Sequence, residues 1–157
     1  AASDVYKRQV IDLERSVEGY ACSYIELGDP GIPHAIVLMP DWDERDRDTL
    51  RALGRALRFA KEFPRGANVS FVKIVDSRHV KAITYERGVE DFTLACGTGC
   101  GSVASVLWKK GLLPGGVLTA HNMGGTLKIT IDGENGDVTS LLLEGPTEIT
   151  KIYDLDI

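Results

Sequence analysis

The stretch YERGVEDFTLACGTG, Tyr85–Gly99, decides the fold, and a helix-like run, Ser102–Lys110, follows directly behind it. It places Cys96 at the mouth of a glycine-rich turn that leads into a helix. A helix N-terminus presents free N–H groups and the positive end of a dipole, which favours a thiolate and can also hold a carboxylate. The segment therefore predicts a reactive sulfur beside an anion site, an arrangement suited to removing the α-proton of an amino acid.

Other interpretations of this segment fit its residues less well. A cysteine among small residues is most often a buried apolar filler, but three glycines within five residues are costly unless the backbone must approach something closely. A dinucleotide fingerprint would need glycine or alanine at Ser102, and a phosphate loop would need Gly-Lys-Ser/Thr. A zinc site would need more ligands than Cys96 and Cys100, and the histidines are scattered, so no metal is expected.

The rest of the chain shows strand patterns around two helices. A helix is expected over Asp46–Phe63, where leucines recur at helical spacing and Pro64 ends the run. The second helix, Ser102–Lys110, is mostly apolar. Strands are expected at Tyr20–Leu27, His34–Met39, Val69–Val75, Val80–Tyr85, Leu127–Ile131, Val138–Leu143 and Glu148–Tyr153. The pattern predicts an α+β fold, a bent antiparallel or mixed sheet or barrel wrapped around the apolar helix.

Composition narrows the class of protein. The net charge of −5 gives no electrostatic support for binding nucleic acid. No apolar run approaches the ~18 residues that a membrane helix needs, so no membrane partner is expected. The three cysteines are an odd number in a chain too large to need disulfide staples, which fits a reducing compartment and predicts a cytoplasmic location.

The segment around Cys96 resembles the second catalytic motif of the diaminopimelate epimerase family, the cofactor-independent amino-acid epimerases of lysine and cell-wall biosynthesis. The resemblance covers roughly Ser23 to the C-terminus. Further matching segments follow in the family's order, namely Gly31–Ala35, Pro64–Val72, Gly124–Leu127 and Leu143–Pro146. The family's enzyme has two similar halves, each with one catalytic cysteine at the start of a central helix. The resemblance implies that this chain is the second half and that its chemistry needs no cofactor.

The resemblance also implies a role for each matching residue. Cys96 would be one member of a thiol/thiolate pair, in which one thiolate removes the α-proton and the other cysteine delivers a proton to the opposite face. The backbone amides of Gly97 and Thr98 would bind the substrate carboxylate. Glu86 would contact substrate and tune a catalytic thiol. The remaining implied residues are Arg87 and Asn68 for substrate binding and His34 for modulating the other thiol.

The residues alone leave plainer roles open for three of these side chains. Arg87 could be a surface ion-pair partner of Glu90. Asn68 could cap a turn, and His34 could be a strand residue with a satisfied imidazole. The chain also departs from the family pattern at two places. Ile32 stands where many members carry a substrate-contacting asparagine, and the spacing between Arg87 and Cys96 is one residue longer than in the commonest pattern. A related racemase for a histidine- or hydroxyproline-type substrate is therefore the alternative enzyme.

The expected partners are a small amino-acid substrate and the missing N-terminal half, with a homodimer left open. A first-half Cys-Gly-Asn motif is absent, so an inactive half-enzyme or binding domain is the non-enzymatic alternative. Residues 10–157 are expected to form the domain, whose last strand can belong to the other half. Asp4–Gln9 resembles a translated transposase end sequence, so residues 1–9 are expected to be a cloning or sequencing artefact or a disordered leader that packs on nothing. The isolated half is expected to be inactive and to expose an apolar face with an activated Cys96 thiol.

Overall fold

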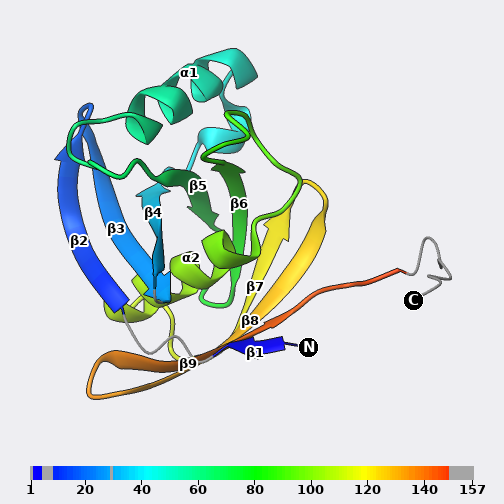
Figure 1. The fold of residues 1–157 in the computed structure, drawn as a ribbon. Coiled ribbons are helices and arrows are strands. Elements are labelled where there is room, and N and C mark those ends of the chain that lie inside the picture. The colour runs from blue at the N-terminus through cyan, green and yellow to red at the C-terminus, as the bar shows by residue number, and fades with distance from the viewer. Residues whose placement is uncertain (1, 5–8, 29, 149–157) are drawn as a thin grey trace, which may run out of the picture.

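The computed structural model describes residues 2–4, 9–28 and 30–148. Their strands form one nine-stranded sheet that curves around a central helix (Figure 1). The order across the sheet is β1-β9-β8-β7-β6-β5-β4-β3-β2. The helices are α1 (Arg47–Arg58) and α2 (Gly97–Lys109), with a short 3-10 helix η1 (Trp42–Glu44) before α1. The strands are β1 (Ala2–Asp4), β2 (Gln9–Val17), β3 (Tyr20–Gly28), β4 (Gly31–Leu38), β5 (Asn68–Ile74), β6 (His79–Tyr85), β7 (Gly116–Asn122), β8 (Gly125–Glu134) and β9 (Asp137–Glu144).

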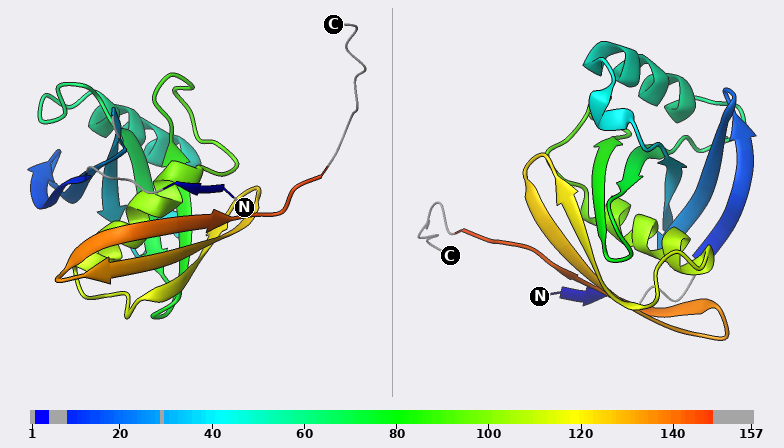
Figure 2. Two further views of the ribbon diagram at one scale, coloured as in Figure 1. Left: turned by 60° about the horizontal axis from the view of Figure 1, so that its bottom comes forward. Right: turned by 180° about the vertical axis from the view of Figure 1, so that it is seen from behind.

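Two parallel strand pairs place the two helices. β4 pairs with β5 and β6 pairs with β7 in parallel, whereas the other neighbouring strands are antiparallel. A parallel pair needs a crossover connection, and the chain makes the first crossover through α1 and the second through α2. α2 lies inside the curve of the sheet, and α1 lies outside it; Figure 2 shows the same arrangement from two further directions.

Alternation along the strands builds one hydrophobic core on each face of the sheet. On β4, Ile36 faces α2, while Ala35 and Val37 belong to the core beneath α1. α2 fills the inner core, and every residue from Gly99 to Leu107 is buried. A helix that is buried on all sides is typical of a protein core rather than a surface. The predicted α+β fold with a bent sheet around a central helix is confirmed.

α1 begins where the sequence indicates but ends earlier. The carboxylate of Asp46 accepts a hydrogen bond from the backbone N–H of Thr49 (2.9 Å) and caps the helix. The helix ends at Arg58, not at Phe63 as expected. Phe63 is instead buried and stacks on Tyr24, with ring centroids 5.4 Å apart. The turn after Arg58 places Phe63 in the core, and this burial outweighs the helical pattern of the segment.

The strand predictions agree with the structure only in part. The two predicted hairpins are present as β5–β6 and β8–β9. The strands β2 and β7 were not predicted. Of the expected last strand, Glu148–Tyr153, only Glu148 lies within the described residues, and it is not in a strand.

Part of the segment that was expected to be a leader pairs with the sheet. Ala2–Asp4 pair antiparallel with β9, and Gln9 already belongs to β2, so these residues do not form an unpaired leader. The edge of β9 offers free N–H and C=O groups, which a short extra strand satisfies. Residues 5–8, including the rest of the segment resembling an end sequence, lie outside the described part of the chain.

Candidate functional site

Polar side chains gather on the inner face of the sheet at the N-terminal end of α2. Along β4, β5 and β6 the inner positions change from apolar to polar toward this end. The parallel register sets His34 beside Asn68, and the antiparallel register sets Ser70 beside Thr84. These four side chains are buried, and the hydroxyls of Ser70 and Thr84 are 2.9 Å apart. The sheet therefore forms a polar floor beneath the first turn of α2.

Cys96 is the N-cap residue of α2. Its sulfur accepts a hydrogen bond from the backbone N–H of Gly99 at 3.3 Å, as an N-cap side chain does. The hydroxyl oxygen of Thr98 lies 3.6 Å from the same sulfur. The predicted placement of Cys96 at a helix N-terminus is correct.

The glycines belong to the helix itself. α2 begins at Gly97, five residues before the expected start at Ser102. A Cβ added to Gly99 would lie 3.1 Å from the sulfur of Cys96 and 3.2 Å from the hydroxyl of Thr84. Poor helix formers are retained here because the sulfur and the polar floor occupy the space that a side chain would need.

The environment of Cys96 differs from the exposed, activated thiol that was expected. Cys96 is buried, with 8% of its surface exposed. Burial raises the pKa of the Cys96 thiol, and the carboxylate of Glu86 adds to that rise. The hydrogen bonds from Thr98 and from the N–H of Gly99 act in the opposite direction but do not outweigh burial. The prediction of a pKa lowered by the helix terminus is wrong for the chain as the structure describes it, because removing water disfavours the charged form.

His34 is buried against the same turn. Its Nε2 lies 3.2 Å from the Thr98 hydroxyl and 3.4 Å from Nδ2 of Asn68. Burial lowers the pKa of His34 to about 3, and the nearby charge of Arg87 contributes. The imidazole is therefore neutral near neutral pH, and Nδ1 is buried with no hydrogen-bond partner among the described residues.

Asn68 connects this group to the loop that carries Arg87. Its Oδ1 accepts a hydrogen bond from the backbone N–H of Arg87 at 2.7 Å. The exposed side chain of Arg87 donates to the carbonyl of Arg65 at 2.9 Å. Glu90 pairs with Arg58 (3.1 Å), so the alternative pairing of Arg87 with Glu90 is not formed.

Glu86 is held by the loop between β6 and α2. The hydroxyl of Thr93 donates to its carboxylate at 2.6 Å, and its N–H donates to the carbonyl of Asp91 at 3.0 Å. Phe92 forms an isolated bridge with Tyr85, which keeps this loop folded back on the sheet. The longer spacing between Arg87 and Cys96 is thus taken up by an ordered turn.

The structure brings together all the predicted site residues, Cys96, Gly97, Thr98, His34, Asn68, Glu86 and Arg87. Sequence reasoning assigned no role to the Thr98 hydroxyl, Gly99, Thr93 or the Ser70–Thr84 pair. Gly99 sits within the decisive motif, so its glycine run was the available signal. The two hydroxyl-bearing strand positions have no signal in sequence, because their proximity depends on strand register.

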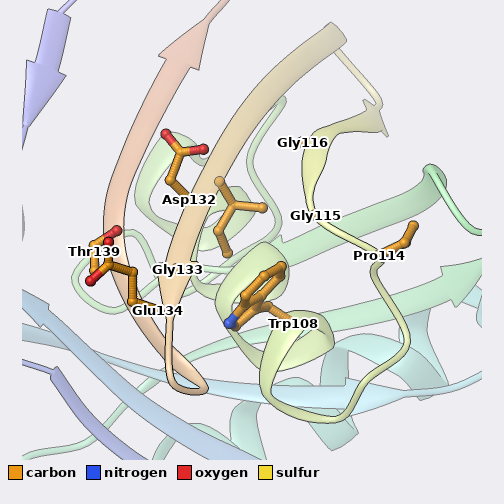
Figure 3. Close-up of a pocket in the computed structure, with 9 residues that line it drawn as sticks. Trp108, Pro114, Gly115, Gly116, Asp132, Gly133, Glu134 and Thr139 are labelled. Atoms are coloured by element: carbon orange, nitrogen blue, oxygen red, sulfur yellow. The ribbon is translucent and has the colours of Figure 1, made fainter.

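The described residues contain a hollow at the opposite end of α2 from Cys96 (Figure 3). It has a volume of about 380 Å³. Its lining consists of Trp108, Pro114, Gly115, Gly116, Ile131, Asp132, Gly133, Glu134 and Thr139. The indole ring packs against Gly115 and Gly133, where an added Cβ would come within 2.8 Å and 2.7 Å of it. This hollow has no cysteine or histidine in its lining, so the candidate site is the one at Cys96.

The described part of the chain shows neither a metal-ligand cluster nor a membrane-spanning helix. No group of three or more histidine, cysteine, aspartate or glutamate residues is arranged there to hold a metal ion. None of the helices in the described ranges has the length and apolar character needed to cross a membrane.

Comparison with known proteins identifies the family. The family model described as diaminopimelate epimerase matches residues 28–149, which include every predicted site residue. The chain belongs to the diaminopimelate epimerase family. The diaminopimelate epimerase of Aquifex aeolicus is 47% identical over 125 residues, and that of Archaeoglobus fulgidus is 33% identical over 160 residues.

The match covers only part of these family members. The aligned region is 79% of this chain but 42% of the Aquifex protein, and 96% of this chain but 55% of the Archaeoglobus protein. The chain thus spans about half the length of the diaminopimelate epimerases it matches. A hydroxyproline epimerase from Agrobacterium vitis has the same fold, with a TM-score of 0.59 at 16% identity over 88% of this chain and 45% of that one.

Proposed function

We propose that this chain is the C-terminal half of a cofactor-independent amino-acid epimerase, in which Cys96 is one of two cysteines that exchange the substrate α-proton. The proposed substrate is diaminopimelate, interconverted between its LL and meso forms in lysine and peptidoglycan biosynthesis. Family membership supports the reaction class, and the arrangement of donors around Cys96 supports the assignment of this residue.

The observation that carries the proposal is a pair of free donors beside the sulfur. In the first turn of α2, the N–H of Gly99 is bonded to the Cys96 sulfur and the N–H of Cys100 to the Cys96 carbonyl. The N–H groups of Gly97 and Thr98 have no acceptor among the described residues, as expected for a helix start. A carboxylate bound there would hold its α-carbon next to Cys96. The donors would also stabilise the negative charge that develops when the α-proton leaves.

Inversion at carbon requires proton transfer on two faces. A thiolate takes the α-proton, the C–H bond breaks and an S–H bond forms; a thiol on the opposite face then gives its proton to the carbanion. Cys96 can serve only one face. The second cysteine is proposed to come from an N-terminal half, and His34, whose buried Nδ1 has no hydrogen-bond partner among the described residues, is proposed to modulate that thiol.

The remaining site residues are proposed to bind and orient substrate. Glu86 lies close enough to raise the pKa of Cys96, which suits a group that tunes the thiol. Arg87 is exposed at the rim, and its charge is available to a second substrate carboxylate. Asn68 holds the Arg87 backbone in place. No cofactor is required by this chemistry, and a cytoplasmic location and a homodimer fit the proposal without being needed for it.

A second substrate class is favoured by one position. Ile32 is 39% exposed two residues before His34, and it offers an apolar surface instead of an amide. A racemase for a histidine- or hydroxyproline-type amino acid is therefore the alternative to diaminopimelate. An inactive half-enzyme or binding domain is the alternative outside catalysis.

The test follows α-hydrogen exchange in D₂O by proton NMR, without added cofactor. The chain alone is expected to show no exchange, whereas the chain joined to its own N-terminal half is expected to exchange diaminopimelate. In the joined protein, Cys96→Ala is expected to lower the rate by about 10²–10⁴-fold, the range for losing a general acid–base group. The control Cys22→Ala removes a buried cysteine of the α1 core and is expected to retain activity.

The other possible outcomes distinguish between the alternatives. Turnover by the chain alone would contradict the two-half mechanism. Undiminished turnover in Cys96→Ala would contradict the assignment of the base. Exchange of histidine or trans-4-hydroxyproline in place of diaminopimelate would select the alternative substrate class.

A further inference from the structure

We propose that the Thr98 side chain is a positioning residue whose hydroxyl couples the protonation of Cys96 to the buried imidazole of His34. The inference rests on the proposed function, in which Cys96 alternates between thiol and thiolate. It concerns a group that the carboxylate-binding role of the Thr98 backbone does not use. The hydroxyl oxygen lies 3.6 Å from the Cys96 sulfur and 3.2 Å from Nε2 of His34, so it is the only bridge between the two among the described residues.

The direction of the hydrogen bonds follows from Asn68. Its Oδ1 is fixed by the backbone N–H of Arg87 at 2.7 Å, so its Nδ2 faces His34 and acts as a donor to Nε2. A neutral imidazole has one protonated and one unprotonated nitrogen. Nε2 is therefore the acceptor, and Nδ1 carries the proton. The chain itself selects this tautomer, because the backbone of Arg87 determines which way the amide points.

The tautomer in turn sets the Thr98 hydroxyl. With an acceptor at Nε2, the Thr98 O–H donates to His34 and shares the single lone pair of Nε2 with the Nδ2–H of Asn68, while the Thr98 oxygen accepts the S–H of Cys96. When Cys96 loses its proton, the hydroxyl rotates and donates to the thiolate, while Nδ2 of Asn68 remains a donor to Nε2. The proton that leaves the S–H bond goes to the substrate carbanion to form the C–H bond. Thr98 and His34 keep their own protons throughout.

The sulfur thus has one fixed and one reversible partner. The N–H of Gly99, at 3.3 Å, can only donate, so it always favours the thiolate. The Thr98 hydroxyl can accept from the thiol or donate to the thiolate. A hydrogen bond that the hydroxyl donates to the charged thiolate is stronger than one that it accepts from the neutral thiol. Loss of the hydroxyl is therefore expected to disfavour the thiolate. Cys96 must be a thiol in one half-reaction and a thiolate in the other. The Thr98 hydroxyl can form a hydrogen bond with both of these states.

Other charged and titratable groups face the same sulfur and imidazole. Glu86 lies on the loop after β6, and Cys100 lies one turn along α2; each acts on the Cys96 thiol or is acted on by it. Arg87 acts on His34. All of these are left unchanged in the variants below, so a difference between the variants reports the hydroxyl.

The first measurement uses the unmodified 157-residue chain with ¹⁵N-labelled histidine. Long-range ¹H–¹⁵N correlation identifies which ring nitrogen is protonated, and the loss of one signal in His34→Gln assigns the resonance. We expect the proton on Nδ1 of His34. A proton on Nε2 would overturn the proposal, and this measurement needs no substituted Thr98.

The second measurement compares the pH dependence of Cys96 alkylation by iodoacetamide, with the modified residue located by peptide mass spectrometry. Thr98→Val removes the hydroxyl at nearly constant volume, whereas Thr98→Ser keeps it. Losing one hydrogen bond to the thiolate is expected to raise the thiol pKa by about one unit and slow alkylation at fixed pH about tenfold in Thr98→Val. Thr98→Ser is expected to follow the unmodified chain.

Equal profiles for Thr98→Val and the unmodified chain would overturn the proposal. Equal losses in both variants would also do so, since the effect would then not depend on the hydroxyl. Neither measurement requires turnover. Failure of the epimerase assay with these results intact would therefore count against the proposed function and not against the coupling.

Discussion

Two glycines in α2 allow the crowding at the candidate site to be measured against a matched control. Gly99 and Gly101 lie two residues apart in the same buried helix, and each can be changed to alanine. Alanine in a helix interior is more stable than glycine by about 1 kcal/mol, and this gain applies to both positions. The difference between the two variants therefore reports the surroundings of the new methyl group.

The surroundings differ sharply. A Cβ at Gly101 would meet side-chain carbons of Leu141 and Leu27 at 3.7 Å, which is ordinary contact. A Cβ at Gly99 would meet the Cys96 sulfur at 3.1 Å and the buried Thr84 hydroxyl at 3.2 Å. Both neighbours would have to shift by a few tenths of an ångström, and such overpacking costs about 1–3 kcal/mol.

The expected result is that Gly101→Ala stabilises the chain by up to about 1 kcal/mol, raising its Tm by about 2–4 °C. Gly99→Ala is expected to be less stable than Gly101→Ala by about 1–3 kcal/mol. Urea denaturation followed by circular dichroism measures both. Gly99→Ala should also alkylate more slowly at Cys96, because the displaced sulfur loses its N–H donor. Equal stability of the two variants, together with unchanged alkylation, would refute the account of Gly99.

Two further predictions concern the dependence of stability on pH. The pKa of His34 is about 3 in the folded chain, against 6.5 ordinarily. Because the unfolded chain binds this proton at a higher pH, the free energy of unfolding should fall as pH falls from about 6.5 to about 3. His34→Gln should remove this part of the decline, measured by urea denaturation at a series of acid pH values. Hydrogen bonds from Lys73 and Lys81 hold the pKa of Asp43 at about 2, so the stability that they add is present above the ordinary value of 3.8 and lost as pH falls from there to about 2. Asp43→Asn should flatten the same acid titration in that lower range, and an unchanged curve in either variant would contradict the corresponding pKa assignment.

The fold class could be predicted because its strongest signals are local. The leucine spacing of α1 and the apolar run of α2 place both helices, and the hairpins at Asp76–Arg78 and Asp132–Asp137 follow from turn residues. The end of α1 could not be read in the same way, because the burial of Phe63 against Tyr24 is a tertiary contact. The start of α2 was placed late for a related reason. Glycine is a poor helix former in isolation, and only the packing around Cys96 keeps it helical here.

The candidate site shows the same division. The motif around Cys96 located the sulfur and its helix, because both lie in one continuous segment. The contact between His34 and Asn68 depends on the parallel register of β4 and β5, which a single sequence does not encode locally. The direction of the Cys96 pKa shift was misjudged since it is a balance between a helix terminus and burial, and burial is a property of the assembled fold.

The enclosure of α2 has a consequence for local motion. Every residue from Gly99 to Leu107 is buried, so the middle amides of the helix can reach water only when the structure around them opens. The first turn is different, because the N–H groups of Gly97 and Thr98 have no helical acceptor and can rearrange without breaking the ladder behind them. One helix therefore combines a buried, protected segment with an end that is free to adjust. If this end binds the substrate carboxylate as proposed, it can respond to the arriving ligand while the remainder of α2 stays fixed as its support.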